Sequence, residues 1–139
     1  MITDLANKLT IYIQSILTEN NVEADVIVDY VPEYELSELQ AKKVIIIPTN
    51  IEYHDLTRGF LQKNYTYEIG ILQRLNTESE LAGIIDVTET IGASIKGYHL
   101  EGHKCMECKV MQLYNPADYA NAKKVISVLQ ATFKEYRQE

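Results

Sequence analysis

Residues 114–136 read YNPADYANAKKVISVLQATFKEY, and the conformation of this stretch decides the fold of the chain. An apolar series with alternating steps of three and four is typical of the buried side of a helix. That series runs here through Tyr119, Ala122, Ile126, Leu129, Phe133 and Tyr136. However, residues 125–128 are β-branched almost throughout, and the alternating apolar residues that follow favour a half-buried strand. The residues alone therefore leave a helix and a strand open.

Two other segments have the clear periodicity of long helices. Residues 3–18 place their apolar side chains on one face, and Asn20 and Asn21 are suited to end that helix. Residues 81–96 carry a second apolar stripe, and Gly97 follows where a helix end favours glycine. A third, short helix is expected to begin at Asn115-Pro116, because proline fits the first helical position.

The remaining segments indicate strands joined by loops. Residues 64–75 alternate between apolar and polar side chains, whereas residues 42–48 are a nearly continuous β-branched run that ends in Pro48. Strands are also expected at residues 23–31 and 105–114, and loops or surface excursions at residues 32–41, 49–63 and 98–104. We therefore expect an α+β fold, with a mixed, mostly antiparallel β-sheet of about four to five strands flanked by two long helices and one short helix.

The composition is that of an ordinary globular protein. With 139 residues, the chain has the usual size of one domain, so residues 1–139 are expected to fold as a unit. A formal net charge of −7 argues against a nucleic-acid-binding surface, which needs a basic patch. No apolar run is long enough to span a bilayer, and nothing at the start resembles a signal peptide. Two cysteines fit synthesis in a reducing cytoplasm.

Four potential metal ligands lie within ten residues: His99, His103, Cys105 and Cys108. Sulfur and imidazole at close spacing are typical of structural zinc sites. In a regular strand, however, Cys105 and Cys108 would point to opposite faces and could not share one ion. We therefore expect no metal and no cofactor, and we expect Cys108 to behave as a small buried apolar residue.

The segment at 49–63 contains Tyr53, His54 and Arg58, and long loops of this kind often carry function. His54 and Asp55 could form a polar dyad, but no serine or cysteine nucleophile lies close to them in the sequence. Neither a phosphate-binding glycine loop nor a nucleophile-elbow pattern is present. The sequence therefore gives no indication of an enzyme.

The order of these features resembles the tail-terminator, or tail-completion, family of long-tailed bacteriophages. The resemblance covers most of the chain and consists of short patterns. They are the strand ending in Pro48, the tyrosine-containing strand at 65–75, the helix at 81–95, Tyr114-Asn-Pro116, and the closing pattern from Ser127 to Phe133. Charged residues 134–139 depart from it. The resemblance favours a short helix to about Lys123 and a strand over residues 124–134, which we adopt.

The resemblance implies a virion structural protein, made in the host cytoplasm, at the head-proximal end of the tail. There it would form a homo-oligomer, a hexameric ring, that binds the tail tube protein, stops tube polymerisation and joins the tail to the head connector protein. Tyr53, His54 and Arg58 are then candidates for contact with the tube or a neighbouring subunit. No sequence-specific nucleic acid and no membrane is expected as a partner. The alternatives are another head–tail connector or minor capsid component, or a small cytoplasmic zinc-binding module or enzyme.

Overall fold

The computed structural model describes residues 2–29, 42–56, 60–74, 78–117, 120 and 124–135. The chain begins with α1 (Ile2–Glu19), β1 (Ala24–Val28), β2 (Lys42–Leu56) and β3 (Phe60–Arg74). It continues with α2 (Glu78–Ile95), β4 (His99–Leu100), β5 (His103–Gln112) and β6 (Lys124–Glu135). Both long helices predicted from the apolar periodicity are therefore confirmed, within a few residues at their ends.

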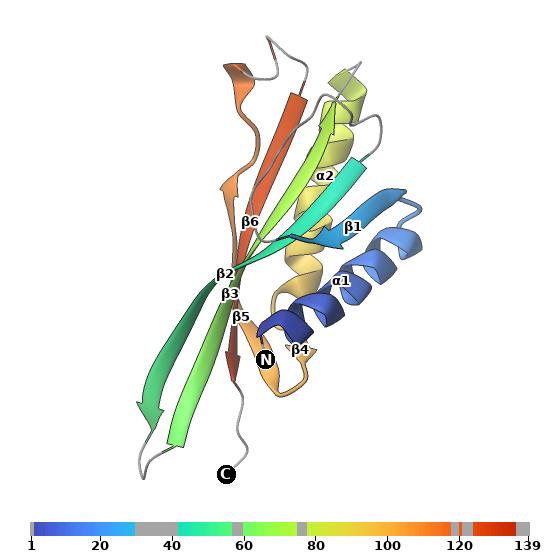
Figure 1. The fold of residues 1–139 in the computed structure, drawn as a ribbon. Coiled ribbons are helices and arrows are strands. Elements are labelled where there is room, and N and C mark those ends of the chain that lie inside the picture. Colours follow the sequence, from blue (N-terminus) through green and yellow to red (C-terminus); the bar gives the residue numbers. More distant parts are fainter. Residues whose placement is uncertain are drawn as a thin grey trace.

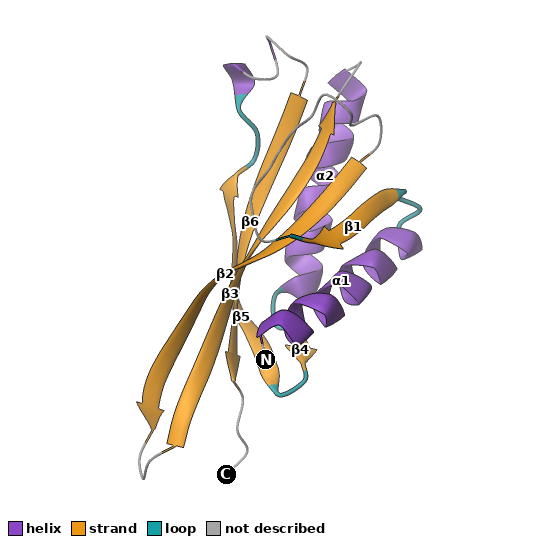
Figure 2. Ribbon diagram, viewed as in Figure 1, coloured by secondary structure: helices purple, strands orange, loops and turns teal. Residues whose placement is uncertain are grey.

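The strands form one mixed sheet in the order β1-β2-β3-β6-β5-β4 (Figures 1 and 2). β1 runs parallel to β2, and every other neighbouring pair is antiparallel. The α+β class and the mixed sheet agree with the prediction, but the predicted number of strands is wrong. Among the described residues the sheet has six strands rather than about four to five. The described elements include two long helices; Pro116, Ala117 and Ala120 are also helical, and the other residues of the expected short helix lie outside the described part.

Both helices pack on the same face of the sheet and enclose the main core between the two layers. The fully buried side chains in this core include Leu9 and Ile13 of α1, Ile84 and Ile91 of α2, and Tyr67 of β3. The Tyr67 hydroxyl donates a hydrogen bond to the backbone carbonyl of Ile2 at 2.8 Å. Burial of these apolar surfaces is the main force that holds the helices on the sheet.

β6 is a central strand, and it decides the conformation of the closing segment. Its side chains alternate strictly: Val125, Ser127, Leu129, Ala131 and Phe133 are buried, and the residues between them are partly exposed. β3 pairs with one edge of β6 from Arg74 to Asn64, and β5 pairs with the other. A helix could not satisfy these two ladders of backbone hydrogen bonds. The predicted strand at 124–134 is confirmed.

The loop predicted at 49–63 is wrong, because this segment forms the far half of a long hairpin. β2 continues past Pro48 to Leu56, and β3 begins at Phe60. A bulge between Pro48 and Asn50 absorbs one extra residue. β1 pairs only with residues 42–46 of β2. Pro48 lies beyond this ladder, so its lack of an N–H group removes no hydrogen bond from it. Pro48 therefore marks a bulge instead of a strand end.

The loop predicted at 98–104 is also wrong, since residues 99–104 form a tight hairpin. His99 and Leu100 of β4 pair with Lys104 and His103 of β5. The two turn residues between the strands, Glu101 and Gly102, have φ values of 44° and 76°. Such a turn, with positive φ at both central positions, matches the twist of a hairpin. The sequence patterns did not predict β4.

Candidate functional site

The clearest projecting feature is the end of the β2–β3 hairpin, residues 51–56 and 60–63, which we call the arm. In Figures 1 and 2 it extends beyond the helical layer, so its helix-side face has no cover among the described elements. Three large apolar side chains lie on that face: Ile51, Tyr53 and Leu61 are 39%, 59% and 39% exposed. Exposed apolar side chains that cluster on one face are typical of a contact surface.

The base of the arm is held by the end of β6. The Gln62 Nε2 atom donates to the backbone carbonyl of Glu135 at 2.8 Å. The Lys63 N–H donates to the Glu135 Oε2 atom at 3.0 Å. Because these bonds join strands that are distant in the sequence, they fix the direction in which the arm leaves the sheet. The arm can therefore present its apolar face in one defined orientation.

Two of the three predicted contact residues lie on the arm. Tyr53 and His54 are both exposed there and point to opposite faces, as neighbours in a strand do. Arg58 lies outside the described residues. On the arm, the His54 Nε2 atom lies 3.6 Å from the Glu52 Oε2 atom. Both side chains are at least half exposed, so this pair adds little to stability.

Within the described residues, the sheet has an open backbone edge on each side. β1 covers β2 only along residues 42–46, and no described strand pairs with the outer edge of residues 47–56. On the opposite side, β4 and the backbone of residues 97 and 98 cover β5 only up to Cys105. Within the described chain, the outer edge of residues 106–112 is therefore also open. Unpaired edges of this length readily pair with another strand.

The β5 edge also carries exposed apolar side chains. They are Met106 (46% exposed), Val110 (47%) and Met111 (57%), and Leu113 (39%) follows just after the strand. Register shifts occur between Cys105 and Glu107 and between Val110 and Gln112, so the two methionines are the extra residues of bulges. We call residues 106–113 the β5 strip. No sequence pattern distinguished the strip from an ordinary strand before the structure was known.

The bulge at Met106 overturns the prediction that Cys105 and Cys108 point to opposite faces. Cys105 lies opposite Phe133 and Cys108 lies opposite Ala131, and these two β6 residues are on the same face. One extra residue in β5 shifts the alternation by one position, so that both thiols face the helical layer.

The histidines do not complete a metal site. His99 is exposed on β4, whereas the ring of His103 stacks on that of Tyr65 with centroids 4.8 Å apart. Among the described residues, no three His, Cys, Asp or Glu side chains gather closely enough to hold a metal ion. Burial lowers the pKa of His103, and its buried Nε2 atom has no hydrogen-bond partner in the described part of the chain. The four potential ligands therefore do not share one site. His99 lies on β4, His103 stacks on Tyr65, and Cys105 and Cys108 form a thiol pair on β5.

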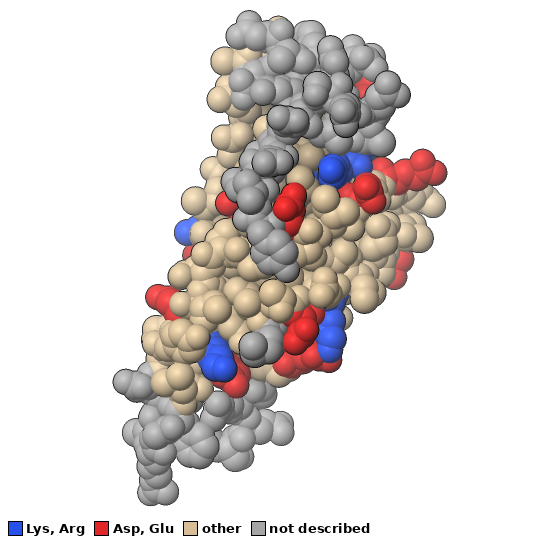
Figure 3. Space-filling view, in the orientation of Figure 1, with Lys and Arg blue, Asp and Glu red and all other residues tan. Residues whose placement is uncertain are grey.

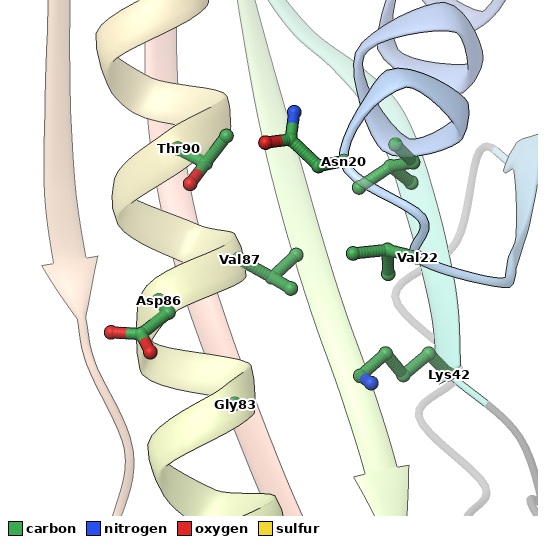
Figure 4. Close-up of a pocket in the computed structure, with 8 residues that line it drawn as sticks. Asn20, Val22, Lys42, Gly83, Asp86, Val87 and Thr90 are labelled. Atoms are coloured by element: carbon green, nitrogen blue, oxygen red, sulfur yellow. The ribbon is translucent and has the colours of Figure 1, made fainter.

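A crevice opens between the end of α1, α2 and the start of β2, with a volume of about 290 Å³ (Figure 4). Its floor is aliphatic, with Leu17, Val22 and Val87, and its rim includes Lys42 and Thr90. Asp86, on the adjoining turn of α2, points away from Lys42 in Figure 4. The described lining contains neither a histidine nor a cysteine.

Charge on the described surface is dispersed. In Figure 3 the lysine and arginine side chains are separated by acidic and uncharged ones, and they form no continuous basic patch on that face. The formal net charge of −7 agrees with this view. Within the described helices, none is long and apolar enough to cross a membrane.

The fold and these surfaces define the protein as an α+β domain with a projecting arm and two open sheet edges. A comparison of the chain with models of known protein families found no match, and a comparison with curated proteins found no significant match. The features that bear on function are therefore the arm, the two edges and the order of elements along the chain.

Proposed function

We propose that this protein is a structural subunit that assembles head to tail into a ring, and that the ring terminates the tail tube of a long-tailed bacteriophage. The observation that carries the first half is the pair of edges, on opposite sides of one sheet, that the described residues leave open. A subunit with two different, outward-facing contact surfaces forms heterologous contacts, and these close into a ring when the rotation between subunits allows it.

The arm and the β5 strip are suited to be these two surfaces. Each offers unpaired backbone groups together with exposed apolar side chains, represented by Tyr53 on the arm and Met111 on the strip. Backbone hydrogen bonds give affinity in strand addition, and side-chain pockets give specificity. Because the arm is fixed at its base by Glu135, little ordering entropy would be lost on contact.

The second half of the proposal is supported by the order of elements. A continuous helix over residues 117–136 would have argued strongly against the tail-terminator resemblance. Instead, β6 occupies Lys124–Glu135, as the closing strand of that pattern requires. The leading helix, the strand through Pro48 and the long helix before β5 also occur in the expected order.

The acidic charge is compatible with a ring through which DNA passes. Each subunit has a formal charge of −7, so a ring of several subunits repels phosphate and lets DNA slide without binding. Termination itself is a matter of shape: one ring face binds the last ring of the tube, and the other face offers no surface for a further tube subunit. No catalytic step is needed. A head–tail connector or minor capsid component would share the ring but bind a different neighbour.

The decisive experiment adds the purified protein to polymerising tail tube protein of the same virus. Electron microscopy then measures the tube lengths and the density at the tube ends. We expect a ring at one end of each tube and no elongation past it. Analytical ultracentrifugation over a wide concentration range measures self-association separately.

The outcomes distinguish the alternatives. A protein that stays monomeric at every concentration and neither binds tube ends nor limits their length contradicts the proposal. If the protein forms a ring that does not bind the tube but binds connector or capsid protein, the ring half of the proposal stands. The tail-terminator assignment is then replaced by the connector alternative.

A further inference from the structure

Cys105 and Cys108 form a thiol pair at the start of the β5 strip, and both side chains face the helical layer. Both are free cysteines. Through the bulge at Met106 they occupy successive positions on the helix-facing side of β5, opposite Phe133 and Ala131. Cys105 has no exposed surface, whereas Cys108 is half-buried. The pair therefore has one thiol in the core and one that a small solute can approach.

The two thiols interact with each other and with their surroundings. Each takes part in a hydrogen bond with the other, and the Cys105 Sγ atom also lies 3.4 Å from the backbone carbonyl oxygen of Glu107. The hydrogen bond from Cys105 lowers the pKa of Cys108, and the same bond raises the pKa of Cys105. The ammonium group of Lys96, at the end of α2, acts on both sulfurs and favours their thiolate forms.

The strand geometry limits what the pair can do. Two register positions along a strand correspond to a Cα–Cα separation of about 6.4–6.8 Å. That separation lies at the long end of the range of about 4.4–6.8 Å for a disulfide, so oxidation of the pair competes with metal binding and is prevented by reducing conditions. An ion held between the two sulfurs suits this wide spacing.

We propose that Cys105 and Cys108 bind one soft d¹⁰ cation of the Cu(I) class through their two sulfurs. Soft thiolate ligands favour such ions, and a two-ligand site suits Cu(I). Zinc sites in proteins need three or four protein ligands, and the described residues offer no third ligand beside the pair. In the binding step Cu⁺ forms two Cu–S bonds, and the two thiol protons pass to the buffer. The resulting bis-thiolate complex has one negative charge, which the Lys96 ammonium group offsets.

The test is a competition under reducing, oxygen-free conditions. The full-length protein is titrated into the coloured bicinchoninate complex of Cu(I), and the loss of colour measures transfer. We expect the wild-type protein to take one equivalent of Cu(I), with two protons released, and to take no Zn(II) from a coloured zinc chelator. Cys108→Ser should abolish the transfer. Because Cys108 is half-buried, this variant should keep its fold, which circular dichroism checks.

Met106→Leu is the matched control, because it removes the exposed thioether of the bulge and leaves both thiols in place. It should retain Cu(I) as the wild-type protein does. The proposal is overturned if the wild-type protein leaves the copper complex intact, if Cys108→Ser still takes one equivalent, or if Zn(II) is retained equally well. Ring assembly is measured without copper, so failure of this site leaves the proposed function untouched.

Discussion

The ring of Tyr12 on α1 stacks on the ring of Tyr98, with centroids 3.6 Å apart and planes 7° from parallel. The Tyr12 hydroxyl also donates a hydrogen bond to the backbone carbonyl of Ser94 at 3.0 Å. Tyr98 follows α2 and leads into β4, so one side chain connects the first helix to the end of the second and to the β4–β5 hairpin. Lys8 adds an ion pair with Glu101 in the same region.

Substitutions at Tyr12 should separate the hydrogen bond from the stack. Tyr12→Phe keeps the ring and should lower the free energy of unfolding by about 1 kcal/mol. Tyr12→Ala removes both contacts and should lower it by about 2–3 kcal/mol. Urea denaturation followed by circular dichroism measures both values. If Tyr12→Ala costs no more than Tyr12→Phe, the stack makes no contribution to stability.

Substitution of Gly83, within α2, and of Gly97, just after it, should change stability in opposite directions. A Cβ added at Gly83 would meet nothing within 4 Å, and alanine is the better helix former. Gly83→Ala should therefore raise the free energy of unfolding by about 0.5–1 kcal/mol. Gly97 has a φ of 81°, so Gly97→Ala should lower it by about 1 kcal/mol. Thermal denaturation of the two variants compares them; a stabilised Gly97→Ala protein would contradict the left-handed turn.

His103 should make stability depend on pH near neutrality. Burial holds its folded-state pKa below the ordinary value of 6.5, so the unfolded chain takes up a proton that the folded protein does not. The contribution of neutral His103 is present above the unfolded pKa and is lost as the pH falls below it. We expect the free energy of unfolding to decrease between pH 7 and pH 5.

His103→Gln cannot titrate, so its unfolding free energy should decrease less over the same interval. Urea denaturation at a series of pH values compares it with the wild-type protein. Equal slopes for the two proteins would show that other groups, such as the nearby Glu135 carboxylate, cause the dependence.

The exposed aromatic side chain of the arm should matter for assembly and not for folding. Tyr53 is 59% exposed, so Tyr53→Ser should change the free energy of unfolding by less than about 0.5 kcal/mol. If the arm contacts a neighbouring subunit, the same substitution should weaken self-association by at least about tenfold, or about 1.4 kcal/mol. Sedimentation velocity at several concentrations measures the association.

Ile11→Ser is the matched control for this prediction. Ile11 lies on α1 and is 70% exposed, but it belongs to neither the arm nor the β5 strip. It should therefore leave self-association unchanged. Equal weakening by both substitutions would indicate a general loss of exposed apolar surface, and an unaffected Tyr53→Ser protein would exclude the arm as an interface.

Local patterns were sufficient for the parts of the fold that are stabilised within short segments. The stripe from Leu5 to Leu17 predicts α1, because its spacing places every apolar side chain on the buried face. The β-branched run of β2 likewise predicts a strand covered on both faces, where Ile45 and Ile46 are both buried. The sequence predicts the candidate site less completely: it singles out Tyr53 and His54, but it places them in a loop.

The sequence by itself determined the two helices, the apolar strands and the acidic charge, because these depend on composition and on periodicity along the chain. Only the tertiary structure decided the form of the arm, the β4 hairpin, the two open edges and the shared face of Cys105 and Cys108. These features depend on which strands pair and in which register. One extra residue in a bulge, such as Met106, reverses the face of the residues that follow it, and it is visible only against the partner strand.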